Sequence, residues 1–203
     1  MALIKLNNRS VKDATAFGSI SSLGSLTFIS KQTASSSANI SFTSGIDSTY
    51  KEYIFYFVNM HPATSSAHFT FNMSTDSGSN YNVTKTTTYF HSAHDEADSA
   101  TEVAYQSPSD LAQSTDFHRL QNFSANSDDS SCSGILHIYN PSSTTFVKHF
   151  TSTFNSMSYT STPYSLNAFT AGYGNTTSAV DAIQFKYSSG NIDSGDILLY
   201  GVN

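Results

Sequence analysis

The chain of 203 residues contains one cysteine, Cys132, and no tryptophan. A single thiol cannot form an intramolecular disulfide, so the fold must be stabilised by core packing or by association between chains. Cys132 lies at the start of a predicted strand, where a small buried hydrophobic side chain is the ordinary role of an unpaired cysteine. We therefore expect it to be a core residue and not a reactive thiol.

Basic residues and long apolar runs are also scarce. The chain carries nine Lys or Arg against fifteen Asp or Glu, a net charge of −6, and such a chain lacks the basic surface that phosphate binding requires. No stretch approaches the ~18 apolar residues of a membrane-spanning helix, and the apolar run at positions 1–6 is too short for a signal peptide. We expect a soluble protein made in the cytoplasm, with no nucleic-acid partner and no membrane insertion.

Strand-forming and turn-forming residues are what the chain has in quantity. It holds 15 Phe, 12 Tyr and many Ser and Thr, while only 12% of its residues are charged. Thr, Tyr and Phe favour strands and Ser favours turns, so this composition predicts an all-β protein with polar loops. The aromatic residues are numerous enough to bury a core, which argues against disorder.

The segment Tyr53–Val58 is apolar at every position and too short for a typical buried helix. Because such runs are typical of strands covered on both faces, we predict a central strand here. About ten short strands separated by turn residues predict an antiparallel β-sandwich of jelly-roll type. The other predicted strands lie at residues 26–29, 38–43, 67–73, 83–91, 135–139, 146–150, 168–173, 183–187 and 197–202.

Residues 1–24 differ from the rest of the chain in charge. Three of the nine basic residues lie in this segment beside a single acidic residue, whereas the remaining chain is strongly acidic. We predict an extended N-terminal anchoring arm ahead of one β domain at residues 25–203; a first strand followed by a loop is the alternative. The residues expected to anchor the arm are Leu3, Lys5, Leu6, Arg9, Lys12 and Phe17.

Residues 92–131 interrupt the strand pattern. This segment holds eight of the fifteen acidic residues, with Arg119 as its one base, and its apolar periodicity is weak. A loop of this length in a compact domain is usually functional or an insertion that packs against a neighbour. We predict an acidic insertion here, with a short helix at residues 109–112 as its regular element.

Residue types that bind metals gather at His91 and His94, which are followed by Asp95, Glu96 and Asp98. The cluster matches neither an HExxH helix nor a paired-cysteine site, so we predict a solvated acidic loop, no metal and no cofactor. No Gly-X-Ser-X-Gly sequence is present, and acidic residues concentrated in one segment do not supply the facing carboxylates of a glycosidase. We therefore expect no catalytic residues and no enzymatic activity.

Surface binding is the function class that remains. Loops rich in Tyr, Ser and Asn favour recognition, because Tyr supplies rigid contact area and the polar residues adapt their hydrogen bonds. For each tyrosine beside such a loop, the ordinary alternative is a strand-edge aromatic that closes the core. The tyrosines that we expect to contact a receptor are Tyr159, Tyr164, Tyr173 and Tyr187.

Four segments carry a resemblance: MALIKLNNRSVKD at 1–13, NMHPAT at 59–64, NPSSTTFVKH at 140–149 and SSGNIDSG at 188–195. Together they resemble a family of small virion structural proteins from tailed phages that infect marine bacteria. The likeness spans nearly the whole chain, and the motifs are long enough to be specific for the family. It implies an exterior virion component, synthesised in the host cytoplasm, without catalytic residues.

Two locations on the particle fit this resemblance. A fibre or spike protein would dock to the tail through its arm and contact a host-surface glycan or protein with its domain. A capsid decoration protein would bind the major capsid protein and stabilise the shell. Either would work as a symmetric homo-oligomer, for which we expect a trimer, since repeated weak contacts gain avidity. A virion-bound polysaccharide-degrading enzyme is the third possibility, which a facing carboxylate pair in a groove would favour.

Overall fold

The computed structural model describes residues 26–127, 129–159 and 162–202, which form twelve β-strands and one short 3₁₀ helix. The predicted anchoring residues of the N-terminal arm lie outside the described residues. The 3₁₀ helix is η1 (Ser107–Ser109). The strands are β1 (Leu26–Ser37), β2 (Ile40–Phe42), β3 (Glu52–Pro62), β4 (Ala67–Ser74), β5 (Lys85–Asp95), β6 (Thr101–Tyr105), β7 (His118–Ser124), β8 (Cys132–Tyr139), β9 (Lys148–Tyr159), β10 (Pro163–Gly174), β11 (Ala182–Tyr187) and β12 (Ile192–Val202).

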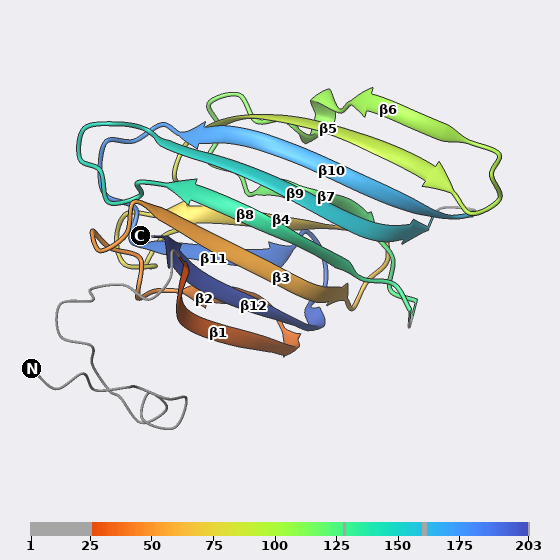
Figure 1. The fold of residues 1–203 in the computed structure, drawn as a ribbon, viewed down its shortest axis with the longest axis horizontal. Helices are drawn as coiled ribbons and strands as arrows, with labels where there is room; N and C mark the ends of the chain where they lie inside the picture. Colours follow the sequence, from red (N-terminus) through yellow and green to blue (C-terminus); the bar gives the residue numbers. More distant parts are fainter. Residues whose placement is uncertain (1–25, 128, 160–161, 203) are drawn as a thin grey trace, which may run out of the picture.

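The strands pair antiparallel in the order β1-β12-β3-β8-β9-β7-β4-β11-β2, and a branch of β10, β5 and β6 extends from β9. The two ends of this order lie close together, because β1 and β2 are consecutive in sequence and Gln32 Nε2 donates to Ser41 O at 2.7 Å. The result is a nearly closed, barrel-like sheet (Figure 1). The prediction of an all-β antiparallel fold is confirmed, while jelly-roll connectivity stays a prediction.

The core is an aromatic cluster to which β3 contributes its inward face. Tyr53, Phe55 and Phe57 are at most 2% exposed. The Phe57 ring lies 4.9 to 5.5 Å from three other rings, those of Phe154, Phe185 and Phe69, in tilted and edge-on arrangements that stabilise aromatic packing. The predicted strand is therefore confirmed, although it is not covered at every position of both faces, since Val58 is 45% exposed.

Residues 92–131 are not the long loop that the sequence predicts. β5 continues to Asp95, β6 pairs with it as a hairpin, and β7 lies between β9 and β4 inside the sheet. The helical element is η1, which shares only Ser109 with the helix predicted at residues 109–112. The prediction failed because inward positions of β7 are polar. His118 and Asn122 are fully or almost fully buried, so the strand lacks the alternation of apolar and polar residues by which a half-buried strand is recognised.

Cys132 is 1% exposed, and its Sγ lies 3.8 Å from the hydroxyl of Tyr187. Burial raises the pKa of the thiol to about 12, so the thiolate is not populated near neutral pH. The prediction of a structural core cysteine is confirmed.

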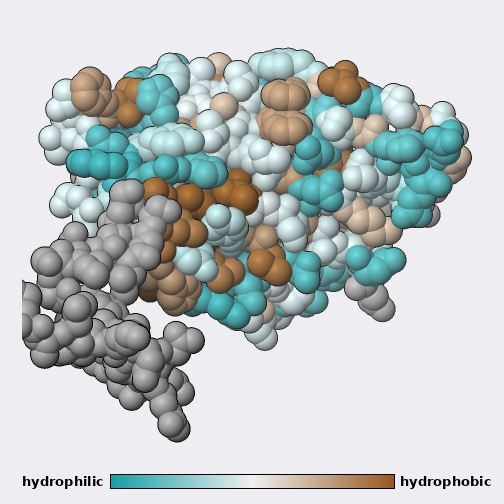
Figure 2. All heavy atoms as spheres, in the orientation of Figure 1, coloured by the Kyte–Doolittle hydropathy of each residue, from teal (hydrophilic) through white to brown (hydrophobic). Residues whose placement is uncertain are grey.

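The outer face of β1, β12 and β3 carries apolar side chains. The strand register sets Phe28 opposite Tyr200, and Tyr200 opposite Ile54. The Tyr200 ring lies 5.5 Å from both the Phe28 and the Tyr56 ring, edge to face. Figure 2 shows hydrophobic side chains gathered over this part of the surface, and Phe28 is 55% exposed. Such a face is a candidate for contact with another chain.

Candidate functional site

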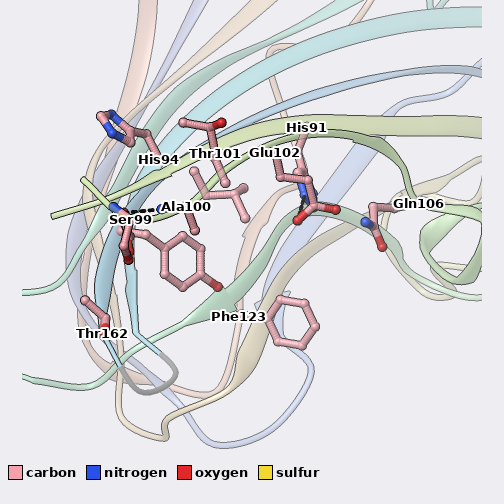
Figure 3. Close-up of a pocket in the computed structure, with 13 residues that line it drawn as sticks. His91, His94, Ser99, Ala100, Thr101, Glu102, Gln106, Phe123 and Thr162 are labelled. Atoms are coloured by element: carbon pink, nitrogen blue, oxygen red, sulfur yellow. Dashed lines mark hydrogen bonds and ion pairs between the residues drawn. The ribbon is translucent and has the colours of Figure 1, made fainter. Parts of the chain in front are cut away.

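A groove of about 690 Å³ opens at the end of the sheet where β5, β6 and β10 meet. Its walls come from five separate segments, including Gln106, Phe123 of β7 and Thr162 (Figure 3). Concave sites of this size with a few convergent polar groups are the usual form of small-ligand sites. The groove is therefore the candidate functional site.

The floor of the groove is set by strand register. Glu102 of β6 pairs with Ala93 of β5, which pairs with Leu166 of β10, so these three side chains form one row on the inner face. Asp95 and Tyr164 form the next row towards the open end. Leu166 is 1% exposed and supplies an apolar base between polar neighbours.

His91 points into the groove from β5 and is 5% exposed. Its Nε2 lies 3.8 Å from Glu102 Oε2, and Figure 3 shows the carboxylate against the imidazole ring. Its Nδ1 is buried and has no hydrogen-bond partner within the described residues. A buried polar atom without a partner is unfavourable by roughly 1–3 kcal/mol, so a ligand atom that reached Nδ1 would be stabilised there.

The two carboxylates of the groove have different roles. Asp95 accepts hydrogen bonds from Ser99 N, Ser99 Oγ and Ala100 N at 2.5 to 2.9 Å, and these bonds hold the pKa of Asp95 below its usual value. Asp95 therefore fixes the β5–β6 turn. The Glu102 carboxylate faces the groove and solvent, with 57% of its side chain exposed. Glu102 is the carboxylate that is free to accept a ligand hydrogen bond.

Tyr164 supplies an aromatic wall and a hydroxyl. Burial raises the pKa of its phenol, and the negative charge of Glu102 adds to the rise. The hydroxyl is therefore protonated at neutral pH and is able to donate a hydrogen bond.

Phe123 stands across the groove in a left-handed backbone conformation, with φ at 54°. Its amide N–H donates to His68 Nδ1 at 3.2 Å, and the two rings lie 5.1 Å apart. Burial, with a smaller effect from Arg119, lowers the pKa of His68 to about 4, which keeps its ring neutral and able to accept this bond. Non-glycine residues in this backbone region are held against a conformational cost and concentrate at functional sites.

The core beside the groove is polar. Gln121 Nε2 donates to Ser156 Oγ, and Ser156 Oγ lies 2.9 Å from Ser158 Oγ. Within the described chain, Gln121 Oε1 and Asn122 Oδ1 are buried without a hydrogen-bond partner. Buried polar atoms are normally satisfied, so these two acceptors are unfavourable for the stability of the fold.

His91 and His94 both line the groove, but they project from opposite faces of β5. Side chains three positions apart on a strand lie on opposite faces, and Figure 3 shows His94 turned away from His91. His94 Nε2 pairs with Asp98 at 3.2 Å instead. The described residues contain no group of three or more side chains arranged to hold a metal ion.

The four predicted receptor tyrosines are dispersed. Tyr164 lines the groove, and Tyr173 packs beside His149 with the rings 6.2 Å apart. Tyr187 is 3% exposed and its hydroxyl donates to Met60 O at 3.0 Å, so the prediction that Tyr187 contacts a receptor is wrong. Tyr159 ends β9, and its side chain lies outside the described part.

Sequence reasoning missed Glu102, Gln106 and Phe123 as site residues, because they belong to the segment interpreted as an acidic insertion, residues 92–131. The one available signal was the alternation in Thr101–Tyr105, which indicates a short strand with Glu102 and Ala104 on one face. No protein-family model, curated protein or solved structure matches the chain.

Proposed function

We propose that this chain is a non-enzymatic structural protein on the exterior of a phage particle. Its role would be that of a fibre- or spike-type component, attached through residues 1–24 and contacting the host surface through the groove. The observation that carries the contact role is the groove itself, where His91 lies beside the Glu102 carboxylate and its buried Nδ1 has no hydrogen-bond partner in the part of the chain that the structure describes. The virion assignment rests on the family resemblance.

The groove chemistry favours a saccharide as the host-surface ligand. Tyr164 and Phe123 supply aromatic faces for the C–H surface of a sugar ring, and Glu102 and Gln106 supply side-chain hydrogen-bond partners for hydroxyls. Saccharide sites use such combinations because each sugar has an apolar face and a polar edge. A weak single-site affinity would suffice in an oligomer, since avidity multiplies it.

The test is binding of the full chain to an array of bacterial surface glycans, with substitutions inside and outside the groove. Glu102→Gln and Tyr164→Phe should each lower the affinity for a bound glycan about tenfold or more, as expected for a lost hydrogen bond of about 1.5 kcal/mol. Glu52→Gln is the matched control: Glu52 also pairs with a histidine, His137, at 2.5 Å, but on the outer face. Equal binding by all variants would refute the groove as the contact site.

Capsid decoration is the second candidate, and the outer apolar face of β1, β12 and β3 favours it. This face carries Phe28 at 55% and Leu26 at 41% exposure and adjoins the start of β1, where the N-terminal segment enters. A second virion protein, such as the major capsid protein, or further copies in a trimer would be its partners. Phe28→Ser should then weaken incorporation into the capsid while leaving glycan binding unchanged.

A polysaccharide-degrading activity is the third candidate, because Asp95 and Glu102 both line the groove. A glycosidase requires one carboxyl group with a raised pKa as proton donor, whereas the turn hydrogen bonds lower the pKa of Asp95. Release of reducing ends from a bound glycan, lost in Glu102→Gln, would establish this activity and refute the non-enzymatic proposal.

No helix among the described residues has the length and hydropathy needed to cross a membrane.

A further inference from the structure

Lys85 is a charged residue type buried at 0% exposure, at the start of β5. Its Nζ lies 2.5 Å from Oδ1 of Asn72, a residue of the preceding strand β4 that is also 0% exposed. Nζ also donates to Val83 O at 2.7 Å. Lysines are almost never fully buried without an ionic partner, and Lys85 has no salt bridge within the described residues.

The Asn72 carboxamide is held in one orientation. Its Nδ2 donates to Tyr81 O at 2.7 Å and to Thr115 O at 2.8 Å, while the Met73 N–H donates to Oδ1 at 2.8 Å. The backbone donor draws electron density onto Oδ1, which makes the Asn72 Cγ more electrophilic. Such a donor also stabilises negative charge that develops on the oxygen during an attack on Cγ.

The Lys85 nitrogen is within reach of the Asn72 carbonyl carbon. A C=O bond is about 1.2 Å long, so a 2.5 Å separation from Oδ1 places Nζ at most about 3.7 Å from Cγ. Reacting atoms in near-attack geometries lie about 3–3.5 Å apart, so a shift of a few tenths of an ångström brings the pair into position.

The amine is available as a nucleophile. Burial lowers the pKa of Lys85 to about 7, although the charge of Asp116 opposes the effect, so about half of the amine is neutral at neutral pH. A desolvated neutral lysine is the activated form in covalent catalysis by amines.

We propose that Lys85 and Asn72 join spontaneously in the folded chain through an isopeptide bond. The lone pair of Nζ attacks Cγ, the carbonyl electrons move to Oδ1, and the Met73 N–H stabilises the resulting oxyanion. A proton passes from Nζ to Nδ2, the Cγ–Nδ2 bond breaks, and the carbonyl reforms. One amine and one primary amide become one secondary amide and one ammonia molecule, with no oxidant or other reactant.

The bond would tie β5 to β4 across the 13 positions that separate the two residues. The chain has one thiol and forms no internal disulfide. An isopeptide bond would supply the covalent cross-link that a disulfide provides in other proteins, and it would not depend on redox conditions. This inference is independent of the proposed attachment function, because it concerns only the covalent structure of the fold.

Intact-mass spectrometry of the full chain tests the proposal. The folded protein should be lighter than its sequence mass by one ammonia molecule. Trypsin should fail to cleave after Lys85 and should release residues 52–119 as a single peptide, lacking fragment ions from within residues 73–84. A full-mass protein that trypsin cleaves after Lys85 would overturn the proposal.

Three variants separate the bond from other losses of ammonia. Lys85→Met and Asn72→Ala should both restore the full mass, whereas a deficit that persists in Lys85→Met would contradict the assignment. Lys148→Met is the matched control: Lys148 is equally buried, but among the described residues its Nζ donates only to the backbone carbonyls of Phe146 and Thr176, at 2.6 and 3.1 Å. This variant should keep the deficit.

Discussion

Mild acid should destabilise this fold because two histidines are held neutral inside it. Burial lowers the pKa of His118 from 6.5 to about 3, and that of His68 from 6.5 to about 4. Between pH 6.5 and 4 the unfolded chain binds more protons than the folded chain at both sites. The free energy of unfolding therefore rises with pH in this window, and the stability present above pH 6.5 is lost as the pH falls towards 4.

The size of the effect follows from the width of the window. Each pH unit between the folded and unfolded pKa of a histidine corresponds to about 1.4 kcal/mol of unfolding free energy. Each histidine should therefore lower the free energy of unfolding by about 2 kcal/mol at pH 5 and by about 3 kcal/mol at pH 4. These losses are large fractions of the free energy of unfolding of a typical domain, which is about 5–15 kcal/mol. Urea unfolding at pH 7.5, 6, 5 and 4.5, followed by tyrosine fluorescence, measures the loss directly.

The variant His118→Phe isolates one of the two contributions. A phenyl ring suits this site because the imidazole already lies 6.0 Å from the Phe71 ring and 5.6 Å from the Phe150 ring. The variant should lose about half of the pH dependence and gain stability at pH 7, since it removes two buried nitrogens that have no hydrogen-bond partner among the residues the structure describes. The control His149→Phe should retain the full pH dependence, because that ring is exposed to solvent in the folded chain. A flat stability profile between pH 7 and 5, or an unchanged slope in His118→Phe, would refute this reasoning.

Three further predictions concern packing, reactivity and attachment. Phe57→Ala, at the centre of the aromatic core, should lower the free energy of unfolding by about 3–5 kcal/mol, measured by urea denaturation; a loss below ~1 kcal/mol would contradict its central place. The Cys132 thiol should resist maleimide labelling at pH 7 and react only once urea unfolds the chain, whereas rapid labelling of the native protein would show that it is accessible. A chain beginning at Ser25 should fold with unchanged stability yet fail to join particles; its normal incorporation would rule out the anchoring role of residues 1–24.

The sequence predicted the strands best where residue type and burial agree. The run Tyr53–Val58 becomes the interior strand β3 because its aromatic residues fill the core. β7 was missed because polar residues occupy its buried positions, and no periodicity rule recognises a strand that buries His118 and Asn122. Turn hydrogen bonds to Asp95, and not apolar patterning, define the β5–β6 hairpin.

Most of the groove could not be predicted from the sequence, because its residues are brought together by pairing between strands that lie far apart in the chain. Tyr164 was identified as a contact residue from composition, and the structure places it in the groove wall. Tyr187 had the same local signature but fills the core, since strand alternation does not reveal which face of β11 is covered. The pairing of Ala93 with both Glu102 and Leu166 depends on the order of β6, β5 and β10, which no local pattern encodes.

The location of the chain on intact phage particles tests the proposed function most directly. Immunogold electron microscopy with an antibody against this chain should place the label on the tail, at the fibres or spike. Label spread over the head would instead establish the decoration role and contradict host attachment through the groove. Particles that carry no label, although the antibody binds the purified chain, would contradict the proposal of an exterior virion protein altogether.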